Sequence, residues 1–174
     1  MTHPLADCQI RRMTAMDAEA FSALRRKVTQ ANPVPMGLTM EEELARPIQG
    51  FRDQLSYPDP NAAFGAFVQG ELVASAAVAW PSKLPSSRHK TKLWGVFVAP
   101  SHRGRGIGRK VVTEAVRHAF ENGVRRVNLQ VFVPNPEAVQ LYLSMGFVEY
   151  GREPEAICLG GTYYDGVHMS LLRE

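Results

Sequence analysis

The apolar positions of this chain follow two different periods, which predicts strands that alternate with helices. Residues 62–69 and 71–80 are largely apolar and are joined by a Gln-Gly pair, the pattern of a β-hairpin. In residues 107–121 the apolar positions recur at helical spacing, which predicts a helix that packs by one face. Residues 127–133 alternate between apolar and polar side chains, as a strand does. The pattern favours an α/β fold.

The amino-terminal part is predicted to hold a short strand and two helices. Residues 8–13 are a weak strand, and residues 18–30 carry apolar side chains at helical spacing. Thr39 and Glu42 have the spacing of a capping box, which predicts that a second helix begins there. Pro47 is expected to interrupt this helix or to bend it.

A glycine-rich loop connects the strand predicted at residues 93–98 to the helix at 107–121. Gly104, Gly106 and Gly108 alternate with Arg and Ile directly before the helical period. Glycine leaves backbone N–H groups uncovered, and the start of a helix favours an anion through its free N–H groups and its dipole. We therefore expect this loop to bind phosphate.

The distribution of charge supports a ligand with several phosphates. Residues 72–113 contain eight Lys or Arg and no Asp or Glu, whereas the rest of the chain holds 12 basic and 17 acidic residues. Four of the eight lie in or beside the glycine loop, namely Arg103, Arg105, Arg109 and Lys110. Such a local positive field attracts a polyanion.

Two familiar nucleotide motifs do not fit the loop, and a third pattern does. A dinucleotide fingerprint that starts at Gly104 would need glycine at position 109, which is Arg109, and no P-loop run is present. The spacing R-x-x-G-x-G is met by Arg103, Gly106 and Gly108. This run resembles the acetyl-CoA loop of the GCN5-related N-acetyltransferases (GNAT family).

A second signature downstream strengthens the resemblance. The family pattern N-x-x-A-x-x-L-Y is met by Asn135, Ala138, Leu141 and Tyr142, and a Gly-Phe pair follows at residues 146–147. The resemblance covers residues 93–149, and the flanks match in general layout. It implies a GNAT-type acyl-CoA N-acyltransferase fold, with a mixed, mostly antiparallel central sheet, splayed strands and flanking helices.

The resemblance also implies acetyl-CoA as co-substrate, with its pantetheine arm between the splayed strands. The residues that it implies for cofactor binding are Phe97, Val98, Arg103, Gly104, Arg105, Gly106, Ile107, Gly108, Asn135 and Tyr142. Among them Phe97 and Val98 would offer backbone groups to the arm, as in the addition of a strand. The N–H of Val98 would donate to the thioester oxygen, on which negative charge grows as an amine attacks.

Two of these residues also have a purely structural interpretation. Asn135 can cap the helix that Pro136 begins, and this alone would explain both residues. Tyr142 could be a core aromatic residue. The resemblance instead makes it the catalytic acid that protonates the departing CoA sulfur. An unperturbed tyrosine near pKa ~10 is a weak donor to a thiolate near ~8.5, so a hydrogen bond to sulfur is the alternative to full proton transfer.

The sequence does not identify the residue that acts as general base. Many GNAT enzymes place a Glu on the strand before the loop, but residues 93–98 contain no carboxylate. Glu71, Asp165 or His168 could act through water, or the amine could arrive neutral. The amine-binding segments are open as well: Glu41, Glu42 and Glu43 either attract a cationic amine or form a solvated face at a helix start.

Two surface segments are also open to more than one interpretation. The polar loop at residues 81–92 is either a surface connection or a contact to the 3′-phosphate or the acceptor. Residues 148–150 and 162–172 are predicted to be closing strands around a Gly-Gly turn. On the second of them, residues 163–165 either line the acceptor side or form a packing or dimer surface, so a homodimer is possible.

The whole chain fits one domain over residues 1–174. Its Cys8 and Cys158 are expected to be reduced and structural, and the scattered His residues predict no metal site. A net charge of +3 predicts no nucleic-acid partner, and no apolar run reaches the ~18 residues of a membrane span. Residues 1–4 lack a signal pattern, so we expect a cytoplasmic protein.

The predicted function is an N-acetyltransferase that moves an acetyl group from acetyl-CoA to a primary amine of a small molecule. The amine would attack directly in a ternary complex, because no residue stands out as a covalent relay. One rival is acetylation of a protein N-terminus or a lysine. Another is a non-catalytic acyl-CoA sensor, which Tyr142 argues against and which the missing strand carboxylate favours.

Overall fold

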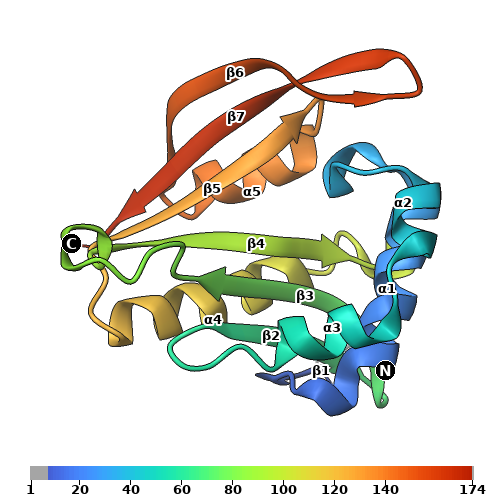
Figure 1. Ribbon diagram of the computed structural model, residues 1–174, viewed down its shortest axis with the longest axis horizontal. Helices are drawn as coiled ribbons and strands as arrows, with labels where there is room; N and C mark the ends of the chain where they lie inside the picture. Colours follow the sequence, from blue (N-terminus) through green and yellow to red (C-terminus); the bar gives the residue numbers. More distant parts are fainter. Residues whose placement is uncertain (1–7, 174) are drawn as a thin grey trace.

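A central seven-stranded sheet organises the chain, of which the computed structural model describes residues 8–173 (Figure 1). Residues 1–4, on which the expectation about a signal pattern depends, lie outside the described part. The strands are β1 (Cys8–Arg12), β2 (Ala62–Val68), β3 (Glu71–Ala79), β4 (Lys90–Val98), β5 (Arg126–Val133), β6 (Val148–Leu159) and β7 (Thr162–Leu172). Their order is β1-β2-β3-β4-β5-β7-β6, and only β4 and β5 pair in parallel. The prediction of a mixed, mostly antiparallel sheet is confirmed.

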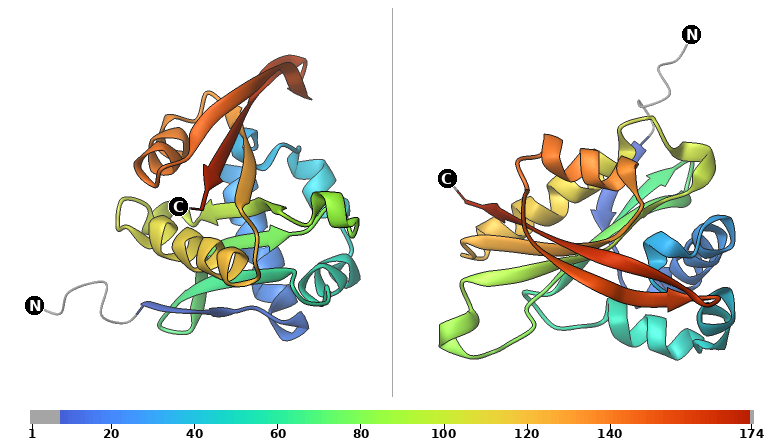
Figure 2. Two further views of the ribbon diagram at one scale, coloured as in Figure 1. Left: turned by 90° about the vertical axis from the view of Figure 1, so that its left-hand side faces the viewer. Right: turned by 90° about the horizontal axis from the view of Figure 1, so that it is seen from above.

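Helices cover both faces of this sheet (Figure 2). They are α1 (Ala18–Ala31), α2 (Met40–Ala45), α3 (Ile48–Leu55), α4 (Ile107–Glu121) and α5 (Pro136–Ser144). Helices α4 and α5 lie on one face, and α1 and α3 lie on the other (Figure 2). Strands β2 and β3 are consequently buried on both faces, which explains why their sequences are apolar almost throughout. None of the helices between residues 8 and 173 is long and apolar enough to cross a membrane.

The hairpin and the long helix form as their sequences predict. Gln69 and Gly70 have φ angles of 50° and 82°, the left-handed conformation that a two-residue hairpin turn requires. Helix α4 buries the apolar face that the spacing predicted, and Gly123, with φ 85°, follows its end.

The second predicted helix is divided at Pro47, as expected, into α2 and α3. The capping box is present: Thr39 Oγ1 accepts from the Glu42 N–H at 3.1 Å, and the Thr39 N–H donates to Glu42 Oε2 at 2.7 Å. Both interpretations of Glu43 are wrong, however. Its side chain is 0% exposed and forms a bidentate ion pair with Arg25 of α1, with N–O distances of 2.9 and 2.8 Å.

Strands β4 and β5 separate soon after they begin. They pair only where Lys90–Lys92 meets Arg126–Asn128, and beyond this point β4 continues beside β3 while β5 continues beside β7. We call the opening between them the fork. The predicted splay of these two strands is therefore confirmed.

Candidate active site

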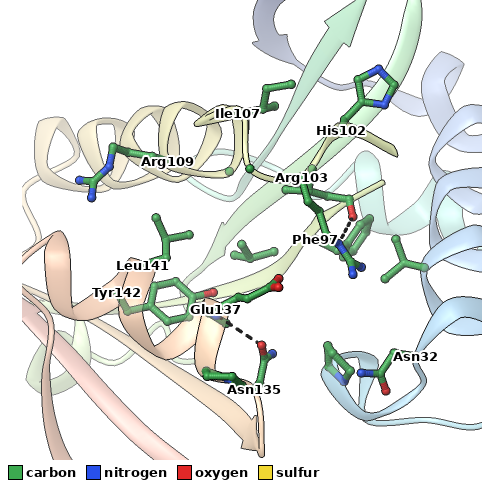
Figure 3. Close-up of a pocket in the computed structure, with 18 of the residues that line it drawn as sticks. Asn32, Phe97, His102, Arg103, Ile107, Arg109, Asn135, Glu137, Leu141 and Tyr142 are labelled. Carbon is green, nitrogen blue, oxygen red and sulfur yellow. Dashed lines mark hydrogen bonds between the residues drawn. The ribbon is translucent and has the colours of Figure 1, made fainter. Parts of the chain in front are cut away.

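A cleft of about 430 Å³ occupies the fork and the start of α4 (Figure 3). Its walls come from the end of β4, the glycine loop, the start of α5 and the end of α1. The lining residues are Val28, Asn32, Pro35, Val96, Phe97, Val98, His102, Arg103, Gly104, Gly106, Ile107, Gly108, Arg109, Pro134, Asn135, Pro136, Glu137, Ala138, Leu141 and Tyr142. Every predicted cofactor residue is in this set except Arg105.

The glycine loop offers backbone to the cleft. Gly104 and Gly106 have φ angles of 72° and 73°, which favour glycine. A Cβ at either position would meet no protein atom within 4 Å, so the space beside them is free for a ligand. The first N–H groups of α4 have no partner inside the helix, and they begin at Ile107. The geometry therefore fits a pyrophosphate bound at a helix start.

The basic side chains near the loop point in different directions. Arg103 lines the cleft and donates from Nε to the Val98 carbonyl at 3.2 Å, which fastens the loop to β4 (Figure 3). Arg109 also lines the cleft and donates to Ser144 of α5. Arg105 is exposed and does not line the cleft, so its predicted part in cofactor binding is not supported.

Replacing Arg103 with alanine is expected to weaken the binding of CoA. A charged hydrogen bond contributes ~1.5–3 kcal/mol, so the Kd should rise about 10- to 100-fold. Isothermal titration of the purified variant with CoA measures this. Arg88→Ala is the control, because Arg88 is exposed and lies before β4, at the end away from the glycine loop. Equal affinities for the two variants would contradict the assignment of Arg103.

The backbone of Val98 faces the fork. The Ala99 N–H donates to the Val73 carbonyl at 2.8 Å, on the β3 side. Successive residues of a strand direct their N–H and C=O groups to opposite sides, so those of Val98 point away from β3. Phe97 turns its own backbone toward β3, and its buried ring stacks on Phe21 with a centroid distance of 5.8 Å. Val98 and not Phe97 thus has the backbone that a ligand in the fork can reach.

Asn135 caps α5 and lines the cleft at the same time. Its Oδ1 accepts from the Ala138 N–H at 3.3 Å, and Pro136 is the first residue of the helix (Figure 3). The structural role is therefore confirmed, and the predicted pantetheine contact stays a prediction. Both are compatible, because the amide nitrogen of Asn135 is not used by the cap.

Tyr142 extends from α5 into the cleft (Figure 3). Only 6% of the residue is exposed, and its ring packs edge-on against Phe147 with a centroid distance of 5.6 Å. Burial raises the pKa of the Tyr142 hydroxyl well above its usual value, because the charged form would be desolvated. The hydroxyl is consequently a neutral hydrogen-bond donor throughout the physiological pH range.

The sequence did not identify several lining residues. Val28, Asn32 and Pro35 come from α1 and the turn after it, where the prolines indicated only a helix end. His102 and Glu137 are polar lining residues beside the two motifs. His102 and Glu137 are close in sequence to Arg103 and Asn135. Whether their side chains face the cleft depends on tertiary packing, which the sequence pattern does not show.

Other candidate residues lie away from the cleft. The loop between β3 and β4 ends at Lys90, at the opposite end of β4 from the glycine loop, and none of its residues lines the cleft. Of its two interpretations, this position favours a surface connection over contact with the 3′-phosphate or the acceptor. Glu71, Asp165 and His168 do not line the cleft. Tyr163 is exposed on β7. The homodimer, the single domain and the cytoplasmic location stay predictions. Between residues 8 and 173, His, Cys, Asp and Glu form no group of three that could hold a metal ion.

Comparison with known proteins gives one consistent family. Residues 27–147 match the family model described as Acetyltransferase (GNAT) family. Spermidine N(1)-acetyltransferase of Vibrio cholerae is 34% identical over 86 residues, which cover 49% of this chain and 50% of that protein. Streptothricin acetyltransferase of Streptomyces lavendulae is 34% identical over 102 residues, 57% of this chain and 49% of that protein. The chain thus spans about half the length of these curated relatives.

Solved structures share the fold over nearly the whole chain. A GNAT superfamily phosphinothricin acetyltransferase from Sinorhizobium meliloti, in complex with acetyl-CoA, superposes with a TM-score of 0.80. The alignment covers 95% of this chain and 88% of that one at 18% sequence identity. At this identity the likeness concerns the fold.

Proposed function

This chain belongs to the acetyltransferase (GNAT) family, and from that premise we propose that it transfers the acetyl group of acetyl-CoA to a primary amine of a small molecule. The observation that carries the proposal is the fork: the open backbone of β4, the start of α4 and Tyr142 all border one cleft. Two curated relatives named for spermidine and streptothricin support a small-molecule acceptor.

The residues of the cleft fit CoA along its length. The N–H groups at the start of α4, with Arg103, would hold the pyrophosphate, and the fork would hold the pantetheine arm. The co-substrate brings a thioester, whose carbonyl carbon an amine can attack. The Val98 N–H would stabilise the charge on the carbonyl oxygen, and the Tyr142 hydroxyl would donate to the departing sulfur.

Direct attack in a ternary complex is favoured over a covalent relay. Cys8 and Cys158 are the free cysteines of the described residues, and neither lines the cleft. Both substrates would therefore have to be bound at once. Initial velocities measured against both substrates should give intersecting double-reciprocal lines, whereas parallel lines would indicate an acetyl-enzyme.

A thiol-release assay with acetyl-CoA and a panel of amines tests the proposal. We expect sustained release of CoA with at least one small amine, together with the acetylated amine by mass spectrometry. Turnover with peptides alone would favour acetylation of a protein N-terminus or a lysine. Thermal stabilisation by acetyl-CoA without turnover on any amine or peptide would indicate a sensor and overturn the proposal.

A further inference from the structure

The face of the sheet opposite α4 and α5 carries a polar cluster next to the fork. Asn128 of β5 is the last residue paired with β4, so Gln130 is the next residue on the same face of β5, just beyond the separation. Gln130 pairs with His168 of β7, which places both side chains on this face. Two residues further along, Phe132 contacts Gly37 in the turn after α1. The cluster therefore lies on the face of β5 against which the turn after α1 packs, beside the residues where β5 has separated from β4.

Three side chains of this cluster contact one another. Gln130 donates from Nε2 to Glu153 Oε2 of β6 at 2.9 Å, and His168 Nε2 lies 3.5 Å from the same oxygen. Gln130 reaches Glu153 by crossing Gly166 of β7, where a Cβ would overlap its amide nitrogen and press on Ala156. Glycine at this position thus permits the arrangement. The His168 side chain is 31% exposed, so water reaches it.

Titratable and charged groups from two neighbouring strands lie near the imidazole. Glu153 and Tyr150, both from β6, face it, and the ring centres of Tyr150 and His168 are 5.9 Å apart. On the β5 side, Arg126 donates to Ser170, two residues beyond His168 on the same face of β7. A carboxylate is therefore the charged group that lies closest to the imidazole.

The other two candidates for the base are occupied elsewhere. Glu71 forms an ion pair with Lys27 at 2.9 Å, and its pKa is lowered by that hydrogen bond. It lies at the start of β3, beyond the part of that strand that pairs with Val98. Asp165 accepts from the Glu155 N–H at 3.1 Å and pairs with the last residue of β5, past the cluster. Of the three candidates, His168 alone pairs with the β5 residue that follows the separation from β4 on this face, and water reaches its side chain.

We infer that His168, oriented by Glu153 and Gln130, accepts the proton of the acceptor amine in the proposed reaction. The inference rests on the proposed function. The amine arrives as an ammonium ion and gives one proton to His168 through water, because His168 does not line the cleft itself. Its lone pair forms the N–C bond to the acetyl carbon while the C–S bond breaks. The second proton of the nitrogen ends on the sulfur as CoA thiol, and His168 later releases its proton to solvent.

The variant His168→Gln tests the inference through the pH dependence of kcat. At pH 7 we expect kcat to fall about 10²-fold, the scale of general base catalysis, with the KM for acetyl-CoA little changed. Without the base, the reaction needs amine that solvent has already deprotonated. The deficit should therefore shrink about tenfold per pH unit and disappear once the amine is neutral. Glu153→Gln should show a smaller deficit with the same pH trend, because Glu153 acts through His168.

His89→Gln is the matched control, since His89 is exposed in the loop before β4, at the far end from the glycine loop. It should retain the wild-type profile. A loss of kcat in His168→Gln that is equal at every pH would indicate a structural effect, and no loss would mean that His168 is not the base. Either result would overturn this inference and leave the proposed function standing. A wild type that turns over no amine would overturn the proposed function and this inference with it.

Discussion

Tyr142→Phe is expected to lower kcat by about 10²-fold or more while the Kd for CoA stays nearly unchanged. The hydroxyl lies in the cleft, and its removal takes away the donor that would stabilise the departing sulfur. The ring packs against Phe147, and phenylalanine retains that contact. The substitution therefore removes one polar group and leaves the packing of α5 intact.

The environment of Tyr142 favours a hydrogen bond over complete proton transfer. An ordinary tyrosine near pKa ~10 is already about 1.5 units too weak an acid to protonate a thiolate near ~8.5. Burial raises the pKa of Tyr142 further, which makes transfer in the ground state more uphill. We therefore expect kcat to show no alkaline limb from Tyr142 below pH 10.

The measurement pairs steady-state turnover with isothermal titration of the same preparation. Tyr163→Phe is the matched control, because Tyr163 is exposed on β7 and does not line the cleft. It should leave both kcat and affinity unchanged. Near-normal turnover of Tyr142→Phe would remove Tyr142 from the mechanism, and a matching loss of CoA affinity would make it a binding residue.

Glu43→Gln is expected to lower the free energy of unfolding by about 3–5 kcal/mol. The Glu43 side chain is fully buried and satisfies the Arg25 guanidinium through two hydrogen bonds. Glutamine has the same shape but no charge, so the substitution leaves a buried, unpaired cation. Phe21, Phe51 and Phe97 surround Arg25, each with its ring centre 5.7 to 5.8 Å from the guanidinium carbon, and supply no other anion.

Urea unfolding measures this difference, with Glu41→Gln as control. Glu41 is exposed on the same helix, so its loss should change the free energy of unfolding by no more than ~0.5 kcal/mol. The double variant Arg25→Met with Glu43→Leu removes both charges and should recover most of the lost stability. If Glu43→Gln were as stable as the control, the ion pair would not be what holds α2 against α1.

The sequence predicted the part of the cleft formed by the glycine loop, α4 and α5 well, because its main features depend on residues that are close together in the chain. The glycine conformations of the loop, the Asn135 cap and the apolar face of α4 each depend on residues close together in the chain. The two motifs then placed the loop and Tyr142 relative to one another. The structure brought Gly106, Asn135 and Tyr142 to one cleft, as the motifs required.

The acceptor half was less predictable because its contacts join distant segments. The partner of Glu43 is 18 residues away on another helix, and nothing in the local run of three glutamates marked the third as buried. The polar cluster joins side chains of β5, β6 and β7. The hydrogen bond from Gln130 to Glu153 requires glycine at position 166, and the alternation of residues along β5 gives no sign of this. Arg105 stands in the glycine loop, but its position in the sequence did not reveal that it lies outside the cleft lining.

Isothermal titration of the wild-type protein with acetyl-CoA, at two temperatures, tests the central claim most directly, since a binding enthalpy can be near zero at one temperature. Binding in the cleft between the glycine loop, the fork and Tyr142 predicts a saturable isotherm with one site per chain, weakened by Arg103→Ala and retained by Tyr142→Phe. Folded protein that gives no heat at either temperature would contradict the assignment of the cleft and the transferase reaction built on it.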